Sequence, residues 1–252
     1  WRWPIMGLVV KDISKTFGEK TSKTEVLKDI NFEVKDGEFI ILNGASGSGK
    51  TTLLTILGGL LSQTSGDVVY EGKSLFERHT NKAHLRLNDI GFIFQASHLV
   101  PYLKVLDQLT LIGKETGMSS KEAQARAKEL LTKIGLEEQL NSYPHMLSGG
   151  EAQRVAIARA ICMQPDYILF DEAISSLDMS MQTQILDLLK RLRHSHQLSY
   201  IFITHDIQAA TYICDDLLIF KNGCIEARTS ISELHRQQNG YTRELIDKQL
   251  SI

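Results

Sequence analysis

The sequence has few cysteines, no long apolar run and almost no net charge. Its 3 cysteines, Cys162, Cys214 and Cys224, cannot all pair and form no Cys-x-x-Cys motif, which excludes a disulfide framework or structural zinc site and indicates a reducing compartment. No apolar run approaches the roughly 18 residues that cross a bilayer. With 28 Lys and Arg against 30 Asp and Glu, the net charge of −2 argues against a nucleic-acid-binding surface. We therefore expect a cytoplasmic protein without a membrane span.

Short apolar runs, by contrast, recur along the chain of 252 residues. Each is bounded by turn signals, which is typical of strands buried on both faces of a parallel sheet; the runs are residues 39–42, 167–170, 200–203 and 217–220. Residues 8–13 and 26–34 alternate more in polarity, and we expect them to form an antiparallel flank. The sequence therefore predicts an α/β fold.

The middle of the chain has a helical pattern. Ser119 and Glu122 form a capping-box pattern that opens a helix ending near Gly135. Asn222-Gly223 predicts a hairpin turn, and two short amphipathic helices are expected from about Ser230. We thus expect a core at about 7–96 and 159–252 that is interrupted by a helical subdomain at about 97–158, with residues 1–6 as a leader or cloning scar.

A phosphate-binding loop follows the first of the buried runs. The pattern Gly-x-x-x-x-Gly-Lys-Thr is complete and lies between a strand and a helix, as this motif requires. The glycines let successive N–H groups point at phosphate oxygens, Lys50 would reach the β- and γ-phosphates, and the Thr51 hydroxyl would bind Mg²⁺. The residues expected to bind ATP here are Gly44, Ala45, Ser46, Gly47, Ser48, Gly49, Lys50, Thr51 and Thr52.

Two carboxylates end the apolar run at residues 167–170. Ligands lie at the carboxyl ends of strands in open α/β sheets, so Asp171 is placed to hold Mg²⁺ and Glu172 to polarise the attacking water. Such a pair alone also occurs as the first charges of a following helix. Together with the phosphate-binding loop, it predicts an ATPase with a P-loop NTPase (RecA-like) core.

Residues 147–151, Leu-Ser-Gly-Gly-Glu, with Gln153 and Arg154 after them, resemble the signature motif of ATP-binding cassette (ABC) ATPases. Ser148 and the two glycines open a helix whose N-terminus suits a phosphate. The resemblance implies a single nucleotide-binding domain over 7–252 that dimerises head to tail. In such a dimer, the signature of one subunit completes the ATP site of the other; its residues here are Ser148, Gly149, Gly150 and Glu151.

The same resemblance assigns four further residues. Phe17 matches the aromatic that stacks on adenine, and Gln95 matches the loop glutamine that contacts Mg²⁺ and water. Asp178 matches the dimer loop, and His205 matches the switch histidine at the γ-phosphate. Alone, Phe17 is typical of a core aromatic and His205 of a helix cap. Catalysis would thus rest on Glu172, His205, Lys50 and Gln95, with Thr51, Gln95 and Asp171 around Mg²⁺. Ala173 and Ile174 depart from the family, where importers carry Pro-Thr.

Two transporter types remain open. Residues from about 7 to 147 resemble haem-efflux and lipoprotein or macrolide exporters, whereas those from about 151 to 250 resemble importers of nickel, metal chelates or oligopeptides. The resemblance implies an integral membrane permease, which would dock at about residues 95–109, and a peripheral location on the cytoplasmic face of the membrane. Because that docking segment resembles exporters, we favour haem-type efflux and a homodimer. A soluble, non-transport ABC protein is the alternative from another class.

Overall fold

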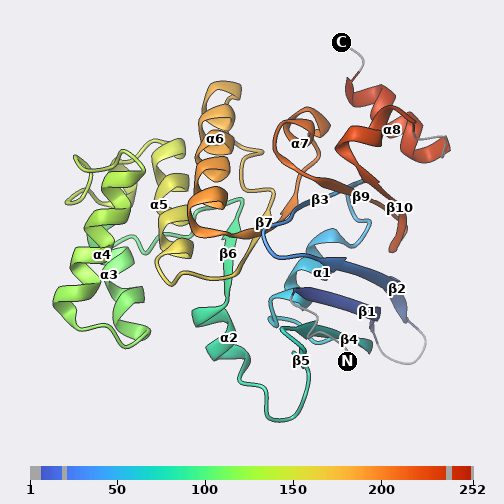
Figure 1. The fold of residues 1–252 in the computed structure, drawn as a ribbon, viewed down its shortest axis with the longest axis horizontal. Coiled ribbons are helices and arrows are strands. Elements are labelled where there is room, and N and C mark those ends of the chain that lie inside the picture. Colours follow the sequence, from blue (N-terminus) through green and yellow to red (C-terminus); the bar gives the residue numbers. More distant parts are fainter. Residues whose placement is uncertain (1–6, 19–21, 237–239, 251–252) are drawn as a thin grey trace. The chain divides into compact units, whose positions relative to one another are not determined.

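The structure is a computed structural model and describes residues 7–18, 22–236 and 240–250 (Figure 1). The expected leader at residues 1–6 lies outside the described residues. The chain divides into two compact units, one built from the residues up to Lys82 with those from Ser199 onward, the other from Ala83–Leu198. The expected bounds of the core and of the helical subdomain stay a prediction.

The first unit contains an antiparallel sheet. Its strand order is β2-β1-β4-β5, with bounds Thr24–Val34, Leu8–Phe17, Ser65–Tyr70 and Lys73–Ser74. The pairing of β1 with both β2 and β4 is antiparallel. This confirms the antiparallel flank that the alternating pattern predicts.

A second group of strands in the same unit surrounds β3 (Phe39–Gly44), in which every residue is buried. β3 pairs in parallel with β8 (Ser199–Ile203) and with β9 (Asp216–Lys221), while β10 (Cys224–Ser230) runs antiparallel to β9. Burial on both faces explains why β3, β8 and β9 are continuous apolar runs rather than alternating ones, whereas the edge strand β10 is largely polar and partly exposed.

The hairpin between β9 and β10 is also confirmed. Asn222 and Gly223 have φ values of 50° and 81°, which suits a two-residue hairpin turn because both central residues need positive φ.

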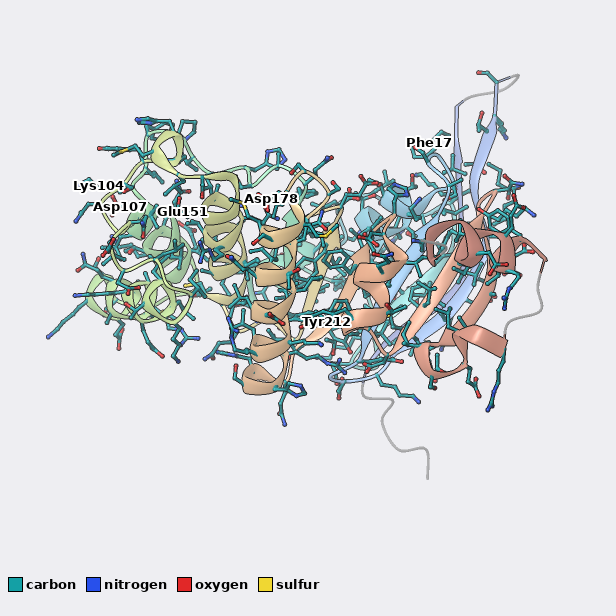
Figure 2. The ribbon with its side chains drawn as sticks, turned by 90° about the horizontal axis from the view of Figure 1, so that it is seen from above. Phe17, Lys104, Asp107, Glu151, Asp178 and Tyr212 are labelled. Carbon is teal, nitrogen blue, oxygen red and sulfur yellow. The ribbon has the colours of Figure 1, made fainter. Side chains whose placement is uncertain are left out.

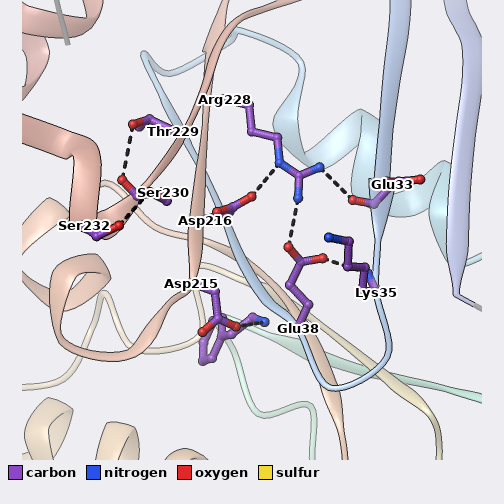
Figure 3. Close-up of polar contacts among 10 residues, drawn as sticks. Glu33, Lys35, Glu38, Asp215, Asp216, Arg228, Thr229, Ser230 and Ser232 are labelled. Carbon is purple, nitrogen blue, oxygen red and sulfur yellow. Dashed lines mark hydrogen bonds and ion pairs between the residues drawn. The ribbon is translucent and has the colours of Figure 1, made fainter. Parts of the chain in front are cut away.

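An arginine cluster fixes the start of β3 (Figure 3). Arg228 Nε lies 2.6 Å from Asp216 Oδ2, its Nη2 lies 2.8 Å from Glu38 Oε1, and its Nη1 donates to the Glu33 carbonyl at 2.9 Å. The same turn is held by Asp215 Oδ2, which accepts from the Phe39 amide at 2.9 Å. Because charge-assisted pairs with a planar guanidinium are directional, the cluster sets the geometry with which the chain enters β3.

In the part of the first unit that the structure describes, three α-helices and one 3₁₀ helix accompany the strands. α1 buries its apolar side chains, including Leu53 and Leu57, and the C-terminal segment forms a 3₁₀ helix before α8. The bounds are α1 Lys50–Leu57, α7 Ile207–Ile213, η2 Ile231–Arg236 and α8 Gly240–Leu250. Two short helices after Ser230 are thus confirmed, although the first is a 3₁₀ helix.

The second unit pairs β6 (Ile90–Phe94) in parallel with β7 (Tyr167–Asp171). Its helices are α2 Lys82–Asn88, α3 Val105–Glu115, α4 Ser120–Lys133, η1 Pro144–Met146, α5 Gly149–Ile161 and α6 Met179–His196. α3 and α4 pack closely, since a Cβ on Gly113 would lie 2.9 Å from that of Ala123. The capping box of Ser119 and Glu122 is confirmed.

Among the described residues, no helix combines the length and the apolar character needed to cross a bilayer.

Candidate active site

The phosphate-binding loop needs its glycines for steric reasons. Gly44 has φ 153°, and a Cβ there would lie 2.3 Å from the Phe220 carbonyl oxygen of β9. Gly49 has φ 103°, and a Cβ there would lie 2.9 Å from the Val26 carbonyl oxygen. Both positions therefore accept only glycine, and the close packing fixes the two ends of the loop.

Lys50 lies across this loop and is only 5% exposed. Its Nζ donates to the carbonyl oxygens of Gly44 and Ala45, both at 2.8 Å, and to Ser48 Oγ at 3.3 Å. α1 begins at Lys50, and its N-cap Gly49 supplies no side-chain cap. A buried ammonium and the positive end of a helix dipole thus meet in one loop, which suits the phosphates of a nucleotide.

Phe17 and His205, the other expected residues of the first unit, are both exposed. Lys15 Nζ lies 4.9 Å from the centre of the Phe17 ring, at the end of β1. His205 follows β8, and the residue before it, Thr204, accepts a hydrogen bond at 2.9 Å from Asn43 Nδ2. This bond ties the end of β3, where the phosphate loop begins, to the start of the His205 loop.

Asn43 is a buried polar residue that no sequence motif marks. It is 1% exposed, and its Oδ1 has no hydrogen-bond partner within the described part of the chain. A buried amide oxygen without a partner destabilises a fold by about 1–3 kcal/mol. The signal in the sequence is one polar residue that directly continues the apolar run of residues 39–42.

In the second unit, the register of β6 and β7 brings Gln95 and the two carboxylates together. Phe94 lies opposite Asp171, so Gln95 and Glu172 each follow directly after a paired residue at the carboxyl ends of neighbouring strands. Glu172 has φ 50°, which is uncommon outside glycine, and its carbonyl accepts from the Ser175 amide at 3.1 Å. Such backbone strain in a non-glycine residue is common at functional positions.

The two residues that differ from the family pattern, at positions 173 and 174, are buried in the core. Ala173 and Ile174 are 1% and 2% exposed, and the Ile174 carbonyl accepts from the Leu177 amide at 3.1 Å. The loop toward Asp178 is therefore closed by buried apolar contacts and a backbone turn, and Asp178 remains at its end.

The signature residues form the N-terminus of α5. Ser148 is the N-cap: its Oγ accepts from the Glu151 amide at 3.3 Å, and its own amide donates to Glu151 Oε2 at 2.8 Å. The Ser148 amide, and after it the Ser148 hydroxyl, donate to the Glu151 carboxylate and lower its pKa from the usual value. Gly149 is thus exposed at a helix end that Ser148 and Glu151 already cap.

The N-terminus of α6 lies beside it (Figure 2). Asp178 caps α6, since its Oδ1 accepts from the Met181 amide at 2.9 Å. A Cβ on Gly149 would lie 3.4 Å from Leu177 Cδ2, and one on Gly150 would lie 3.0 Å from Met181 Sδ. The signature and the dimer-loop residue therefore share one surface of the second unit.

The expected site residues thus fall into two sets. Phe17, residues 44–52 and His205 belong to the first unit; Gln95, Ser148–Glu151, Asp171, Glu172 and Asp178 belong to the second. A hydroxyl, an amide oxygen and a carboxylate, from Thr51, Gln95 and Asp171, are the hard oxygen donors that Mg²⁺ takes together with water. The chemistry of each of these three donors, taken singly, fits Mg²⁺.

A phosphate-binding loop between β3 and α1, with carboxylates at the end of a parallel strand, defines a P-loop ATPase. The family model for the ABC transporter matches residues 27–175. The chain belongs to the ABC transporter family: it is an ATP-binding cassette that binds and hydrolyses ATP. The α/β P-loop fold and the family that the signature motif predicts are thereby confirmed.

Similar proteins agree with this assignment. The hemin import ATP-binding protein HrtA of Staphylococcus epidermidis is 83% identical over 201 residues, which cover 80% of this chain and 90% of that protein. The protein of the same name from Staphylococcus aureus is 57% identical over 220 residues, covering 87% and 99%. Among solved structures, the ATP-binding cassette MJ0796 as a dimer with ADP and Pi has a TM-score of 0.81 at 34% identity, covering 89% of this chain and 98% of that one.

Proposed function

We propose that the chain is the ATP-hydrolysing subunit of a haem-type transporter, in which two copies drive a membrane permease. The observation that carries this proposal is the 83% identity over 201 residues to a protein named for hemin transport. The high identity over the matched residues favours a surface that suits the same type of permease.

The length of this match argues against a nickel or metal-chelate importer. Only 150 residues precede Glu151, so at least 201 − 150 = 51 of the matched residues lie in the part whose pattern resembles such importers. A chain with a foreign second half would lose its similarity there. The match therefore favours a haem-type lineage for at least half of the second part as well as for the first.

In the proposed ATP site, each residue acts through the chemistry of its group. Phe17 stacks on adenine, residues 44–52 hold the phosphates, and Lys50 neutralises their charge. Thr51, Gln95 and Asp171 would hold Mg²⁺, which supplies charge neutralisation at the phosphates when bound. Glu172 accepts a proton from the attacking water, and His205 donates a hydrogen bond to the γ-phosphate.

The proposed dimer is head to tail and contains two copies of this chain. Ser148, Gly149 and Gly150 of one copy meet the γ-phosphate held by residues 44–52 of the other, and Asp178 lies beside that contact. The exposed position of Gly149 at the N-terminus of α5 supports this arrangement, because the positive end of a helix dipole favours an anion.

Replacement of the proposed base tests the ATPase part of the proposal. Glu172→Gln keeps the shape of the side chain and removes the proton acceptor, so we expect turnover to fall by about 100-fold or more. ATP binding should persist, and an ATP-dependent dimer should accumulate in size-exclusion chromatography. Normal turnover in Glu172→Gln would remove Glu172 from its role as base.

Reconstitution tests the partner. In lipid, a haem-type permease should increase the ATPase activity of the purified chain. A metal-chelate permease should leave that activity unchanged. Stimulation by the metal-chelate permease alone would overturn the proposal.

We propose efflux as the direction, because the expected docking segment at residues 95–109 resembles exporters, although the relatives above are named for import. In vesicles whose cytoplasmic face points outward, an exporter accumulates haem inside on addition of ATP. Loss of preloaded haem in the same vesicles would reverse the direction.

A further inference from the structure

The segment after Gln95 is an exposed loop whose backbone is held by polar side chains of α5. Arg159 Nη1 donates to the His98 carbonyl oxygen at 2.9 Å, and its Nη2 donates to the Ser97 carbonyl oxygen at 3.0 Å. Two nitrogens of one rigid guanidinium thus hold two successive carbonyl groups, 61 and 62 residues away in the sequence. This two-point contact fixes both the position and the direction of the loop.

Gln153 holds the other side of the same loop. It is 3% exposed, and its Nε2 contacts the Phe94 carbonyl oxygen at 3.4 Å. The His98 ring lies edge-on to the Phe94 ring with the centroids 5.5 Å apart, and His98 has φ 44°. Gln95 therefore lies in a bend, and the residues on both sides of it are bound to α5.

We propose that Arg159 is a positioning residue that fixes the glutamine loop to the signature helix, so that Gln95 and Ser148 move as one body. The inference rests on the proposed function for the role of Gln95. Arg159 and Ser148 lie on the same rigid helix, 11 residues apart or roughly 16 Å at 1.5 Å per residue. Displacement of the helix end at Ser148 is thereby transmitted to the side chain that would contact Mg²⁺.

The charge of Arg159 supports a role beyond packing. Burial lowers the pKa of its guanidinium, and among the described residues Arg159 forms no ion pair. Arg159 is half-buried, and a partly desolvated cation that faces neutral carbonyl groups fills space less favourably than an apolar side chain would. What the guanidinium provides is the fork that joins α5 to residues 97 and 98.

A double-mutant cycle tests whether Arg159 acts through Gln95. We expect Arg159→Gln to lower kcat by about tenfold, the scale of a small misplacement of a catalytic group, with the KM for ATP unchanged within about twofold. In a Gln95→Ala background, Arg159→Gln should have no further effect on kcat. An equal fall in kcat in both backgrounds would overturn the proposal, as would a rise in KM with unchanged kcat.

Two further variants separate positioning from folding. Arg159→Lys keeps the charge but loses the fork, and we expect its kcat to lie between those of wild type and Arg159→Gln. Arg191→Gln, on the exposed face of α6, is the control and should retain the wild-type kcat. A kcat of Arg159→Lys equal to that of wild type would show that the positive charge alone suffices and that the two-point contact of the guanidinium is not required.

Hydrogen exchange without nucleotide tests the contact itself. Amide protons at residues 95–100 should exchange faster in Arg159→Gln than in wild type or in Arg191→Gln. Unchanged exchange would show that Arg159 does not hold this loop. If the wild-type chain failed to hydrolyse ATP, the proposed function would be wrong. The exchange result would still show whether Arg159 holds the loop at residues 95–100.

Discussion

α4 and α5 begin with the same capping box but differ in what lies inside it. In α4, the Ser119 amide donates to Glu122 Oε2 at 2.9 Å and Ser119 Oγ accepts from the Glu122 amide at 3.3 Å. In α5, the equivalent distances between Ser148 and Glu151 are 2.8 and 3.3 Å. Between the box residues, α4 carries Ser120 and Lys121, whereas α5 carries two glycines.

The two glycines lower the stability of α5. Each disfavours a helix by about 0.8–1.0 kcal/mol relative to alanine. Packing explains only part of the choice, because a Cβ on Gly149 would make an ordinary contact with Leu177 at 3.4 Å and one on Gly150 would meet the flexible end of Met181 at 3.0 Å. The two helices thus share the same capping box, and only α5, whose N-terminus is the proposed phosphate contact, carries glycines between the serine and the glutamate.

The largest expected effect comes from a carboxylate at the first helical position. Asp there favours both helices through the dipole, by about 0.3–1 kcal/mol, so Gly149→Asp and Ser120→Asp should both fold. Gly149→Asp places a negative charge where the phosphate of the other copy would lie, and ATPase activity should fall by roughly 100-fold. Ser120→Asp should retain wild-type activity. Equal activities in the two variants would remove the distinction between the helix ends.

Removal of the serine hydroxyl should separate stability from turnover. Ser148→Ala and Ser119→Ala each lose an N-cap, and thermal denaturation should show a similar loss of about 1 kcal/mol for both. Only Ser148→Ala also removes a hydroxyl that would bind phosphate, so its ATPase activity should fall by about tenfold. A loss of activity in Ser119→Ala of the same size would show that the effect of Ser148→Ala comes from the cap alone.

The glutamate of the box should have a smaller effect. Ser148 Oγ also donates to Glu151 Oε2 at 2.8 Å, so the hydroxyl must change partner before it can bind phosphate. Glu151→Gln keeps an acceptor and removes the negative charge, and we expect half-maximal ATP-dependent dimerisation at an ATP concentration lower by about threefold. Glu122→Gln is the matched control. Unchanged dimerisation in Glu151→Gln would show that the carboxylate does not oppose the nucleotide.

Acid should affect the two boxes alike. Hydrogen bonds from Ser119 and Ser148 hold the pKa values of Glu122 and Glu151 below their usual range. A carboxyl group with a lowered pKa in the folded state stabilises the fold at neutral pH, and this contribution is lost as the pH falls through the lowered pKa. At pH values below the usual pKa of glutamate, the denaturation midpoints of Glu122→Gln and Glu151→Gln should therefore depend less on pH than the midpoint of the wild-type chain. A wild-type slope in either variant would refute the contribution of that glutamate.

The sequence predicts the strands and the phosphate loop well because each depends on local pattern. The run at residues 39–42 is buried on both faces, and the box at Ser119 needs only four residues. Asn43 and Arg159 escape such reasoning, because each is one polar residue inside an apolar pattern. Their contacts reach Thr204, Ser97 and His98, between 61 and 161 residues away, and no spacing rule reports a contact of that kind.

The placement of β3 between β8 and β9 has a consequence for synthesis of the chain. The phosphate loop is translated early, yet the strand that carries it pairs with β9, whose last residue, Lys221, follows Gly44 by 221 − 44 = 177 residues. At about 5–20 residues per second, a ribosome needs roughly 9–35 s to cover that distance. A nascent chain therefore holds the complete nucleotide-binding motif long before it holds the sheet that shapes it. We expect ATP binding to begin only after β9 has left the ribosome.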